Sequence, residues 1–449
     1  MPGSGAFTFS VVTIPPPPTP THRGPKRLLL AVILALLVLP PLQTELHLLE
    51  VAPLDGYFDR VPFPKFTWDG LWQSSYQPAM ATYAEDRLGF RSWLQRLRNQ
   101  LAYSVFGQTP VPVVVVGQDD VLFQPVSIEA YLGHDYSGLE MVHRVRRLRV
   151  VQDSLRAHGT QLLLVVAPGK ARIVPQLLPA RYAAQAPQPS NYQAVMLAAR
   201  KYHLNVLDAA ALLQQWQDTT RFPLFPRSGT HWSGYATTLI ADTLFRRIEQ
   251  LTRHDLPDFT SQGYRVATEI DSLRYTDDDL QLILNKIWKI KPYPVAYPHV
   301  VFGPETGKRR VNALVIGDSF AQSFYNFYPY YQKLFTPEAR YWANYEYVFW
   351  PADAPDSHMV RDLNLRQQLT GRDVVLIIAT EQNFGQLGFG FIDQAYRLFR
   401  PVSADERVGI EKLYKELQEK ATWEEMHNDE QIQQHLHERA ESIYDHLHL

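Results

Sequence analysis

The chain has 449 residues, enough for two or three structural domains at ~150 residues per domain. It carries 44 Lys and Arg residues against 46 Asp and Glu, and the resulting net charge of −2 argues against nucleic acid as a partner. The absence of cysteine excludes disulfides, thiolate nucleophiles and iron–sulfur clusters. With 45% hydrophobic residues, the composition is that of a folded protein.

The N-terminal residues predict a membrane anchor. Residues 1–27 form a proline-rich tail that ends in basic residues, and we expect it to be disordered and cytoplasmic. The apolar stretch at residues 28–44 is short against the ~20 residues that span a bilayer, but no cleavage motif follows it. Glu45 and Glu50 come after it, so the positive-inside rule predicts a single-pass inner-membrane protein whose remaining residues are periplasmic. A cleaved signal peptide and a buried core helix are the alternatives.

Residues 45–138 are rich in aromatic side chains, and we expect this region to pack on a catalytic domain that follows it. Apolar residues at helical spacing between Trp93 and Leu101 predict an amphipathic helix whose apolar side faces that domain. The valine-rich residues 111–116 predict a strand that ends in a turn.

Strands and helices alternate over residues 139–400, which predicts a three-layer α/β/α domain with a mainly parallel sheet. The predicted strands are apolar runs at residues 161–167, 205–207, 313–316 and 374–379, and helices are predicted at residues 141–158, 192–203, 236–251 and 280–287. Continuous apolar runs are typical of strands buried on both faces. In folds of this class, ligands bind at the carboxyl ends of the strands.

One predicted strand end carries a candidate nucleophile. Gly317, Asp318 and Ser319 directly follow the strand at residues 313–316. The glycine permits a tight turn, and a serine at the start of the next helix has backbone N–H groups nearby that can stabilise an oxyanion. Ser319 is therefore a candidate catalytic serine, with an ordinary helix N-cap as the alternative.

His231 is the candidate general base for Ser319. It lies in the turn-rich segment at residues 228–235, just before the predicted helix at residues 236–251. Imidazole has the near-neutral pKa that suits proton transfer from a serine hydroxyl. We expect a ring nitrogen within ~3 Å of the Ser319 hydroxyl. A surface or capping histidine is the alternative.

Together these motifs resemble the SGNH hydrolase-like domains of the alginate O-acetyltransferase AlgJ/AlgX family, over about residues 110–385. The resemblance rests on Gly-Asp-Ser-Phe at residues 317–320, Thr-His-Trp at residues 230–232 and Val-Val-Ala-Pro-Gly-Lys at residues 165–170. In that family the serine takes an acetyl group and the histidine activates it, and these roles fall on Ser319 and His231. The resemblance also implies an exported polysaccharide as acceptor and a membrane-bound O-acyltransferase as acetyl donor.

One departure from the family motif affects the predicted mechanism. The family's acid, two residues before the histidine, is replaced here by Gly229. The candidate substitutes are Asp271, Asp277, Asp278 and Asp279, each of which could instead be a carboxylate at a helix N-terminus. Because this acid is missing, an alternative function remains, that of a non-catalytic, membrane-anchored polysaccharide-binding or assembly subunit. A carbohydrate acetyl esterase would use the same serine with water as acceptor.

Amides at two other strand ends are candidates for substrate binding. Asn344 follows an aromatic stretch at residues 340–343, and Asn383 follows the predicted strand at residues 374–379. The alternative for both is turn formation. Lys170 is expected to support its loop.

The C-terminal residues 401–449 are rich in Glu, Gln and His, and their apolar spacing predicts a long amphipathic helix that docks on the domain or on a partner. Histidines dispersed on a polar helix are usually solvated, and the sequence carries no Walker, Rossmann or EF-hand pattern. We therefore predict no metal and no cofactor.

Overall fold

The computed structural model describes residues 23–56, 60–353, 358–420 and 430–448. The chain divides into two compact units, residues 1–98 and residues 99–449. Most of the predicted proline-rich tail falls on residues 1–22, which lie outside the described residues.

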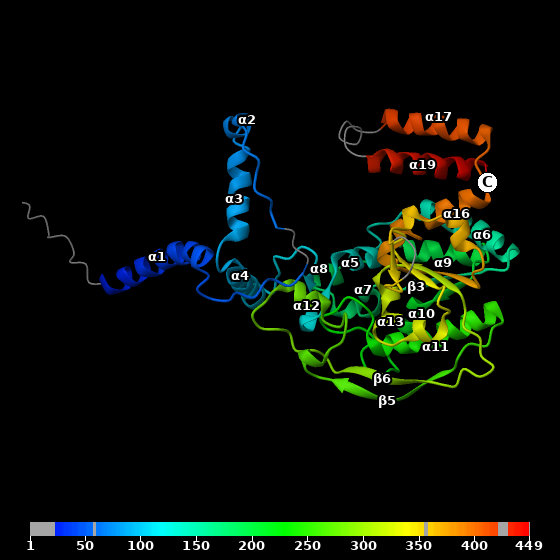
Figure 1. Cartoon of the computed structure of the whole chain (residues 1–449), viewed down its shortest axis with the longest axis horizontal. Coiled ribbons are helices and arrows are strands. Elements are labelled where there is room, and N and C mark those ends of the chain that lie inside the picture. The colour runs from blue at the N-terminus through cyan, green and yellow to red at the C-terminus, as the bar shows by residue number, and fades with distance from the viewer. Residues whose placement is uncertain (1–22, 57–59, 354–357, 421–429, 449) are drawn as a thin grey trace, which may run out of the picture. The chain divides into compact units, whose positions relative to one another are not determined.

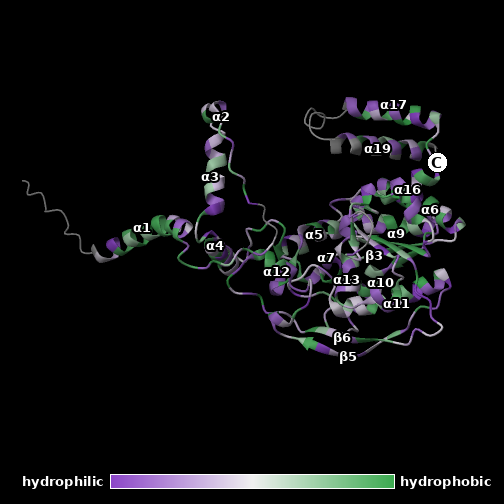
Figure 2. Cartoon of the chain, viewed as in Figure 1, coloured by the Kyte–Doolittle hydropathy of each residue, from purple (hydrophilic) through white to green (hydrophobic). Residues whose placement is uncertain are grey.

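The described part of the first unit is helical. Helix α1 (Arg23–Leu46) contains a segment, Gly24–Leu46, that is long and apolar enough to cross a membrane, as its hydropathy shows in Figure 2. It extends beyond the predicted stretch at both ends. Helices α2 (Trp68–Trp72) and α3 (Tyr76–Arg87) follow, and α4 (Arg91–Phe106) leads into the second unit.

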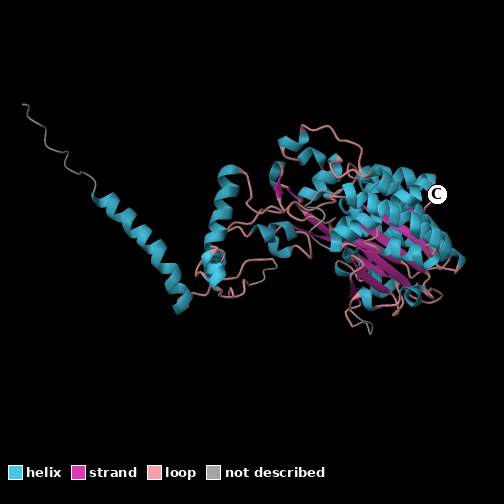
Figure 3. Cartoon of the chain, turned by 90° about the horizontal axis from the view of Figure 1, so that it is seen from above, coloured by secondary structure: helices cyan, strands magenta, loops and turns pink. Residues whose placement is uncertain are grey.

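The second unit is built on a six-stranded sheet with the order β4-β3-β10-β7-β8-β9. Figure 3 shows strands in magenta with helices around them. Its strands are β3 (Gln161–Ala167), β4 (Val206–Asp208), β7 (Ala313–Gly317), β8 (Arg340–Ala343), β9 (Tyr347–Trp350) and β10 (Val374–Thr380). The first five strands in this order are parallel, and β9 is antiparallel to β8. The mainly parallel sheet is confirmed, whereas β8 and β9 were not predicted as strands.

Both faces of the sheet are covered, because side chains along each central strand alternate between two apolar cores. On β3, Leu163 and Val165 belong to one core, while Leu164 belongs to the other. The first core is completed by helices α10 (Ala209–Trp216), α11 (Gly234–Thr252), α13 (Ser323–Asn326) and α14 (Tyr330–Leu334). The second is completed by α6 (Gly138–Ala157), α9 (Asn191–Lys201) and α16 (Phe391–Phe399), which lie on the opposite side of the sheet in Figure 1. The domain is the predicted three-layer α/β/α structure.

Two smaller antiparallel pairs accompany the main sheet. The strand predicted at residues 111–116 is reduced to β1 (Val115–Val116), which pairs with β2 (Leu122–Phe123). A longer pair, β5 (Phe259–Ala267) and β6 (Val295–Phe302), lies within a segment for which no strand was predicted. Most side chains of β5 are exposed, so the sequence there lacks an apolar pattern.

The remaining short elements connect these layers. They are helices α5 (Pro125–Leu132), α7 (Lys170–Ile173), α8 (Ala180–Ala183), α12 (Asp279–Leu284) and α15 (Leu365–Leu369), and the 3₁₀ helices η1 (Gln118–Asp120), η2 (Pro175–Leu177), η3 (Ile270–Ser272), η4 (Ser319–Gln322), η5 (Val360–Asp362) and η6 (Glu381–Gln386). The helix predicted at residues 280–287 is therefore shorter, and it begins at Asp279.

The prediction of a single helix over residues 401–449 is wrong. The described residues there form two helices that pack on each other, α17 (Ala404–Lys420) and α19 (Glu430–His448). Helical periodicity continued through both segments, and it carries no signal for a change of direction.

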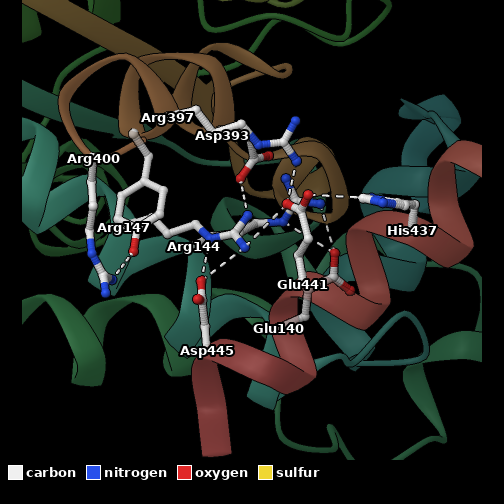
Figure 4. Close-up of polar contacts among 10 residues, drawn as sticks. Glu140, Arg144, Arg147, Asp393, Arg397, Arg400, His437, Glu441 and Asp445 are labelled. Carbon is white, nitrogen blue, oxygen red and sulfur yellow. Dashed lines mark hydrogen bonds and ion pairs between the residues drawn. The ribbon is translucent and has the colours of Figure 1, made fainter. Parts of the chain in front are cut away.

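A buried arginine attaches α19 to the domain. Arg147 of α6 pairs with Asp393 of α16 and, at 2.9 Å, with Asp445 of α19 (Figure 4). Glu441 of α19 lies 3.7 Å from the same guanidinium and also pairs with Arg397. Because a buried charge is costly once its partners are removed, this cluster ties the C-terminal helix to α6 and α16.

Candidate active site

The candidate nucleophile stands on a tight turn at the carboxyl end of β7. A side chain at position 317 would place its Cβ 2.6 Å from the Ile378 carbonyl oxygen, so only glycine fits there. The chain then turns into η4, whose first residue is Ser319. Ser319 is exposed, while its neighbours Asp318 and Phe320 are buried. The turn therefore presents the hydroxyl to solvent at the edge of the sheet.

Asp318 fixes this turn to the neighbouring strands. One of its carboxylate oxygens accepts the N–H of Phe320 at 3.1 Å, and the other accepts the N–H of Thr380 at 2.8 Å. The Tyr341 hydroxyl of β8 donates to the Asp318 carbonyl at 2.9 Å. Since β10 and β8 flank β7 in the sheet, the position of Ser319 is held from both sides.

The segment that carries His231 is anchored in the apolar core. Trp232, which is fully buried, packs edge-on against Phe320 and Phe324. The next residue, Ser233, caps α11 by accepting the N–H of Ala236. The His231 ring itself contacts Phe320, with 4.7 Å between ring centroids. These contacts fix the imidazole next to the turn that bears Ser319.

His231, Ser319 and Asp279 form a continuous hydrogen-bonded chain. The Nε2 atom of His231 lies 2.7 Å from Ser319 Oγ, which confirms the predicted approach of the two side chains. Its Nδ1 atom lies 2.8 Å from Asp279 Oδ2. Because a carboxylate accepts hydrogen bonds, Nδ1 carries the proton and Nε2 accepts the serine hydroxyl. Asp279 Oδ1 also accepts the N–H of Thr230 at 2.8 Å, which ties the carboxylate to the histidine's own segment.

The other three candidate acids do not occupy this position. Asp277 is fully buried and accepts a hydrogen bond from the Tyr297 hydroxyl, and burial raises the pKa of its carboxyl group to about 8. Asp278 is the N-cap residue of α12. Asp271 lies in η3 and is exposed. Asp279, at the start of α12, is the carboxylate that contacts His231.

Lys170 supports the segment before His231 through hydrogen bonds to its backbone. Its ammonium group is buried and donates to the carbonyl oxygens of Arg227 at 2.9 Å and Gly229 at 2.8 Å. Burial lowers the pKa of Lys170 to about 7, and the charge of Asp279 opposes that shift. The predicted supporting role of Lys170 is confirmed by these contacts.

Gly229 is enclosed by the segment that brings in Asp279. A Cβ atom at this position would lie 2.4 Å from the Thr276 carbonyl oxygen and 2.9 Å from the Asp277 carbonyl carbon. Both are backbone atoms, which cannot move aside as a flexible side chain can. The space that an aspartate side chain would need at position 229 is therefore taken by the approach to α12.

We expect Gly229→Asp to impair the protein instead of improving it. The new side chain must displace backbone at residues 276–277, at a cost of ~1–3 kcal/mol in the free energy of unfolding, and it would shift Asp279 away from His231. Thermal unfolding and turnover of a nitrophenyl acetate ester measure the two effects. Gly229→Ala is the matched control, since it tests the lack of space without a charge. A rise in turnover with Gly229→Asp would contradict the role of Asp279.

The side chains of the two candidate substrate amides, Asn344 and Asn383, have structural roles in the fold. Asn383 donates from its side-chain amide to Asp318 Oδ2 at 2.8 Å and so helps to hold the nucleophile turn. Asn344 and Tyr345 both adopt positive φ, 50° and 58°, at the centre of the tight turn between β8 and β9. Asparagine tolerates that conformation well. Substrate binding by Asn344 and Asn383 stays a prediction.

Comparison with known proteins identifies the family. A model described as the SGNH hydrolase-like domain of the acetyltransferase AlgX matches residues 114–342, just over half of the chain. The chain belongs to this SGNH hydrolase-like family. The matched region includes Ser319, His231 and Asp279, and it confirms the resemblance predicted from the motifs.

Individual relatives of this SGNH hydrolase-like chain match over shorter stretches. It is 30% identical over 171 residues to a probable alginate O-acetylase AlgJ of Pseudomonas aeruginosa, covering 38% of this chain and 40% of that relative. The Pseudomonas putida protein of the same name is 26% identical over 184 residues, 41% of this chain and 44% of that relative. The match thus spans less than half of either protein. The solved O-acetyltransferase domain of Pseudomonas putida AlgJ superposes with a TM-score of 0.41 at 20% identity, covering 64% of this chain and 99% of that domain.

Proposed function

We propose that the protein is an O-acetyltransferase that acetylates a polysaccharide through an acetyl-enzyme on Ser319. The observation that carries the proposal is the hydrogen-bonded chain from Asp279 through His231 to Ser319. It supplies a nucleophile, a general base and an orienting carboxylate in the arrangement that acyl transfer requires. The AlgJ relatives, described as probable alginate O-acetylases, support a polysaccharide as the acceptor.

In the first half-reaction, Ser319 Oγ attacks the carbonyl carbon of the acetyl donor. His231 Nε2 takes the serine proton and returns it to the leaving group, and the Oγ–acetyl bond replaces the donor's acyl bond. Asp279 stabilises the imidazolium that forms in between and keeps Nδ1 protonated. The backbone N–H of Ser319 is the donor that we assign to the developing oxyanion.

In the second half-reaction, a sugar hydroxyl attacks the acetyl-enzyme. His231 removes its proton, the Oγ–acetyl bond breaks, and the proton passes to Ser319 Oγ, which restores the free enzyme. Water can replace the sugar because the Ser319 side chain is exposed, so the same site would act as an esterase when no acceptor is bound. The non-catalytic alternative rested on the missing acid at Gly229, and Asp279 now supplies a carboxylate to His231.

The proposed setting is the outer face of a cell membrane. Helix α1 is proposed as a single-pass anchor with the second unit in the periplasm, because basic residues precede its apolar segment. An acetyl group made in the cytoplasm must then cross the membrane before it reaches Ser319. A membrane-bound O-acyltransferase is the partner that we propose as its carrier.

An acetyl-trapping experiment tests the enzymatic proposal. The purified chain is incubated with nitrophenyl acetate, quenched, digested and mapped by mass spectrometry. We expect one acetyl group on the peptide that contains Ser319, and we expect a polysaccharide acceptor to accelerate its loss while gaining O-acetyl groups. Ser261, which is exposed on β5, serves as an internal control for non-specific acetylation. A Ser319 peptide that carries no more acetyl than the Ser261 peptide would rule out the acetyl-enzyme.

A further inference from the structure

The part of α4 within the second unit has its polar side packed and its apolar side exposed. The Asn99 amide donates to the Leu284 carbonyl of α12 at 2.8 Å, and the Gln100 side chain accepts the N–H of Trp288 at 2.9 Å. Gln100 is only 5% exposed. In contrast, Leu101 and Val105 are 52% and 65% exposed. Leu101, which the sequence places on the apolar side of this helix, is thus exposed.

The exposed side of this part of the helix is apolar. Leu101 and Val105 are four residues apart in α4, which places them on one face of the helix. Phe106, at the end of the helix, is 70% exposed. A contiguous apolar surface of this kind marks a site of interaction, because exposing apolar side chains to water is unfavourable.

A second exposed segment lies against the same helix. Residues 286–291 connect α12 to the approach of β6, and they read Lys-Ile-Trp-Lys-Ile-Lys, with no acidic residue. Ile290 is buried and fixes the segment, while Trp288 is 69% exposed. Lys289 and Lys291 are also exposed. The hydrogen bond from Trp288 to Gln100 joins this segment directly to α4.

We propose that residues 99–106 of α4 and residues 286–291 form a surface that lies on the anionic lipid headgroups of the membrane in which α1 is anchored. Tryptophan and aliphatic side chains beside lysine and arginine are the composition of helices and loops that rest in a bilayer interface. The positive charges of Lys289 and Lys291 complement anionic phospholipid.

The anchor makes such a contact favourable. Once α1 holds the chain at a membrane, binding of the surface becomes intramolecular, and its effective concentration rises accordingly. A modest apolar area with a few cations then suffices. The inference thus rests on the proposed anchoring of α1, and it does not depend on acetyl transfer.

The lipid contact would also place the catalytic site. At one end of helix α12, the Leu284 carbonyl accepts a hydrogen bond from Asn99. The other end of the helix carries Asp279, which contacts His231. The surface and the Asp279–His231–Ser319 chain are therefore joined through one short helix. Seating the surface on lipid would keep Ser319 within reach of a donor that emerges from the membrane.

The lack of cysteine in the chain makes a direct test possible. The full chain is reconstituted in nanodiscs that contain phosphatidylglycerol, with a nitroxide spin label at a single introduced cysteine, Val105→Cys or Ile287→Cys. Leu197→Cys is the matched control, an aliphatic residue of α9 with 66% exposure. We expect both surface labels to collide more often with oxygen and much less often with a soluble nickel complex than the control label.

Charge and partner controls complete the experiment. Nanodiscs of pure phosphatidylcholine, or the variant Lys289→Gln with Lys291→Gln, should return the Val105 label toward the nickel accessibility of the control. Surface labels that match the Leu197 label in anionic nanodiscs would overturn the inference. So would shielding that occurs only in discs made from native membranes, which would indicate a protein partner. Acetylation of Ser319 in the same samples reports separately on the proposed function.

Discussion

Replacing Ser319 by alanine should reduce ester turnover by roughly 10⁴-fold or more and abolish the acetyl adduct. The variant lacks the hydroxyl that lies against Nε2 of His231 and that carries the acetyl group in the proposed mechanism. His231→Ala should cost nearly as much, because the hydroxyl then has no base. Initial rates with nitrophenyl acetate measure both effects.

A double variant separates a cooperative site from two independent contributions. If Ser319 and His231 act as one unit, the combined variant should be no slower than Ser319→Ala alone. Ser261→Ala, on exposed β5, should keep full turnover and shows that a serine change by itself does no harm. Residual turnover in Ser319→Ala close to that of the unaltered chain would falsify the assignment of the nucleophile.

Replacing Asp279 by asparagine should lower kcat by ~10²–10⁴-fold and leave KM nearly unchanged. An asparagine amide can donate to Nδ1 of His231, which favours the tautomer with the proton on Nε2. That tautomer cannot accept the Ser319 proton. The shape of the side chain is kept, so the loss would reflect the protonation state of the imidazole.

Asp271→Asn is the matched control for Asp279→Asn. It removes one carboxylate from the same segment, at an exposed position in η3. Its turnover should equal that of the unaltered chain. Equal losses in the two variants would mean that net charge, and not contact with His231, sets the rate.

The sequence predicted those parts of the fold whose signal is local. The buried strands β3, β7 and β10 are continuous apolar runs, so their positions follow from composition alone. Ser319 could be predicted because β7 ends in a glycine and is directly followed by an aspartate and a serine. β8 was read only as an aromatic stretch, since its aromatic side chains are equally typical of a helix core.

The acid of the site could not be chosen from the sequence. The sequence offers four candidate aspartates, and all four lie near the predicted start of a helix. Neither residue type nor position therefore distinguishes one from another. The choice depends on the path of the backbone, which crosses Gly229 at Thr276 and delivers Asp279 to Nδ1 of His231. The apolar side of α4 has a related limit. Periodicity identifies an apolar face, but it does not say what that face contacts, and Leu101 and Val105 are exposed.

The separation of Asp279 from His231 along the chain affects the stability of the site. Between His231 and Asp279 lie helix α11 and the outer strand β5, most of whose side chains are exposed. Segments with few buried contacts open locally at lower free energy than the core sheet. Opening of β5 would loosen the chain that leads to Asp279, while Ser319 and His231 stay on the intact α/β framework. The proposed ester turnover should therefore decline in mild denaturant before the sheet unfolds, so activity and sheet structure would be lost at different denaturant concentrations.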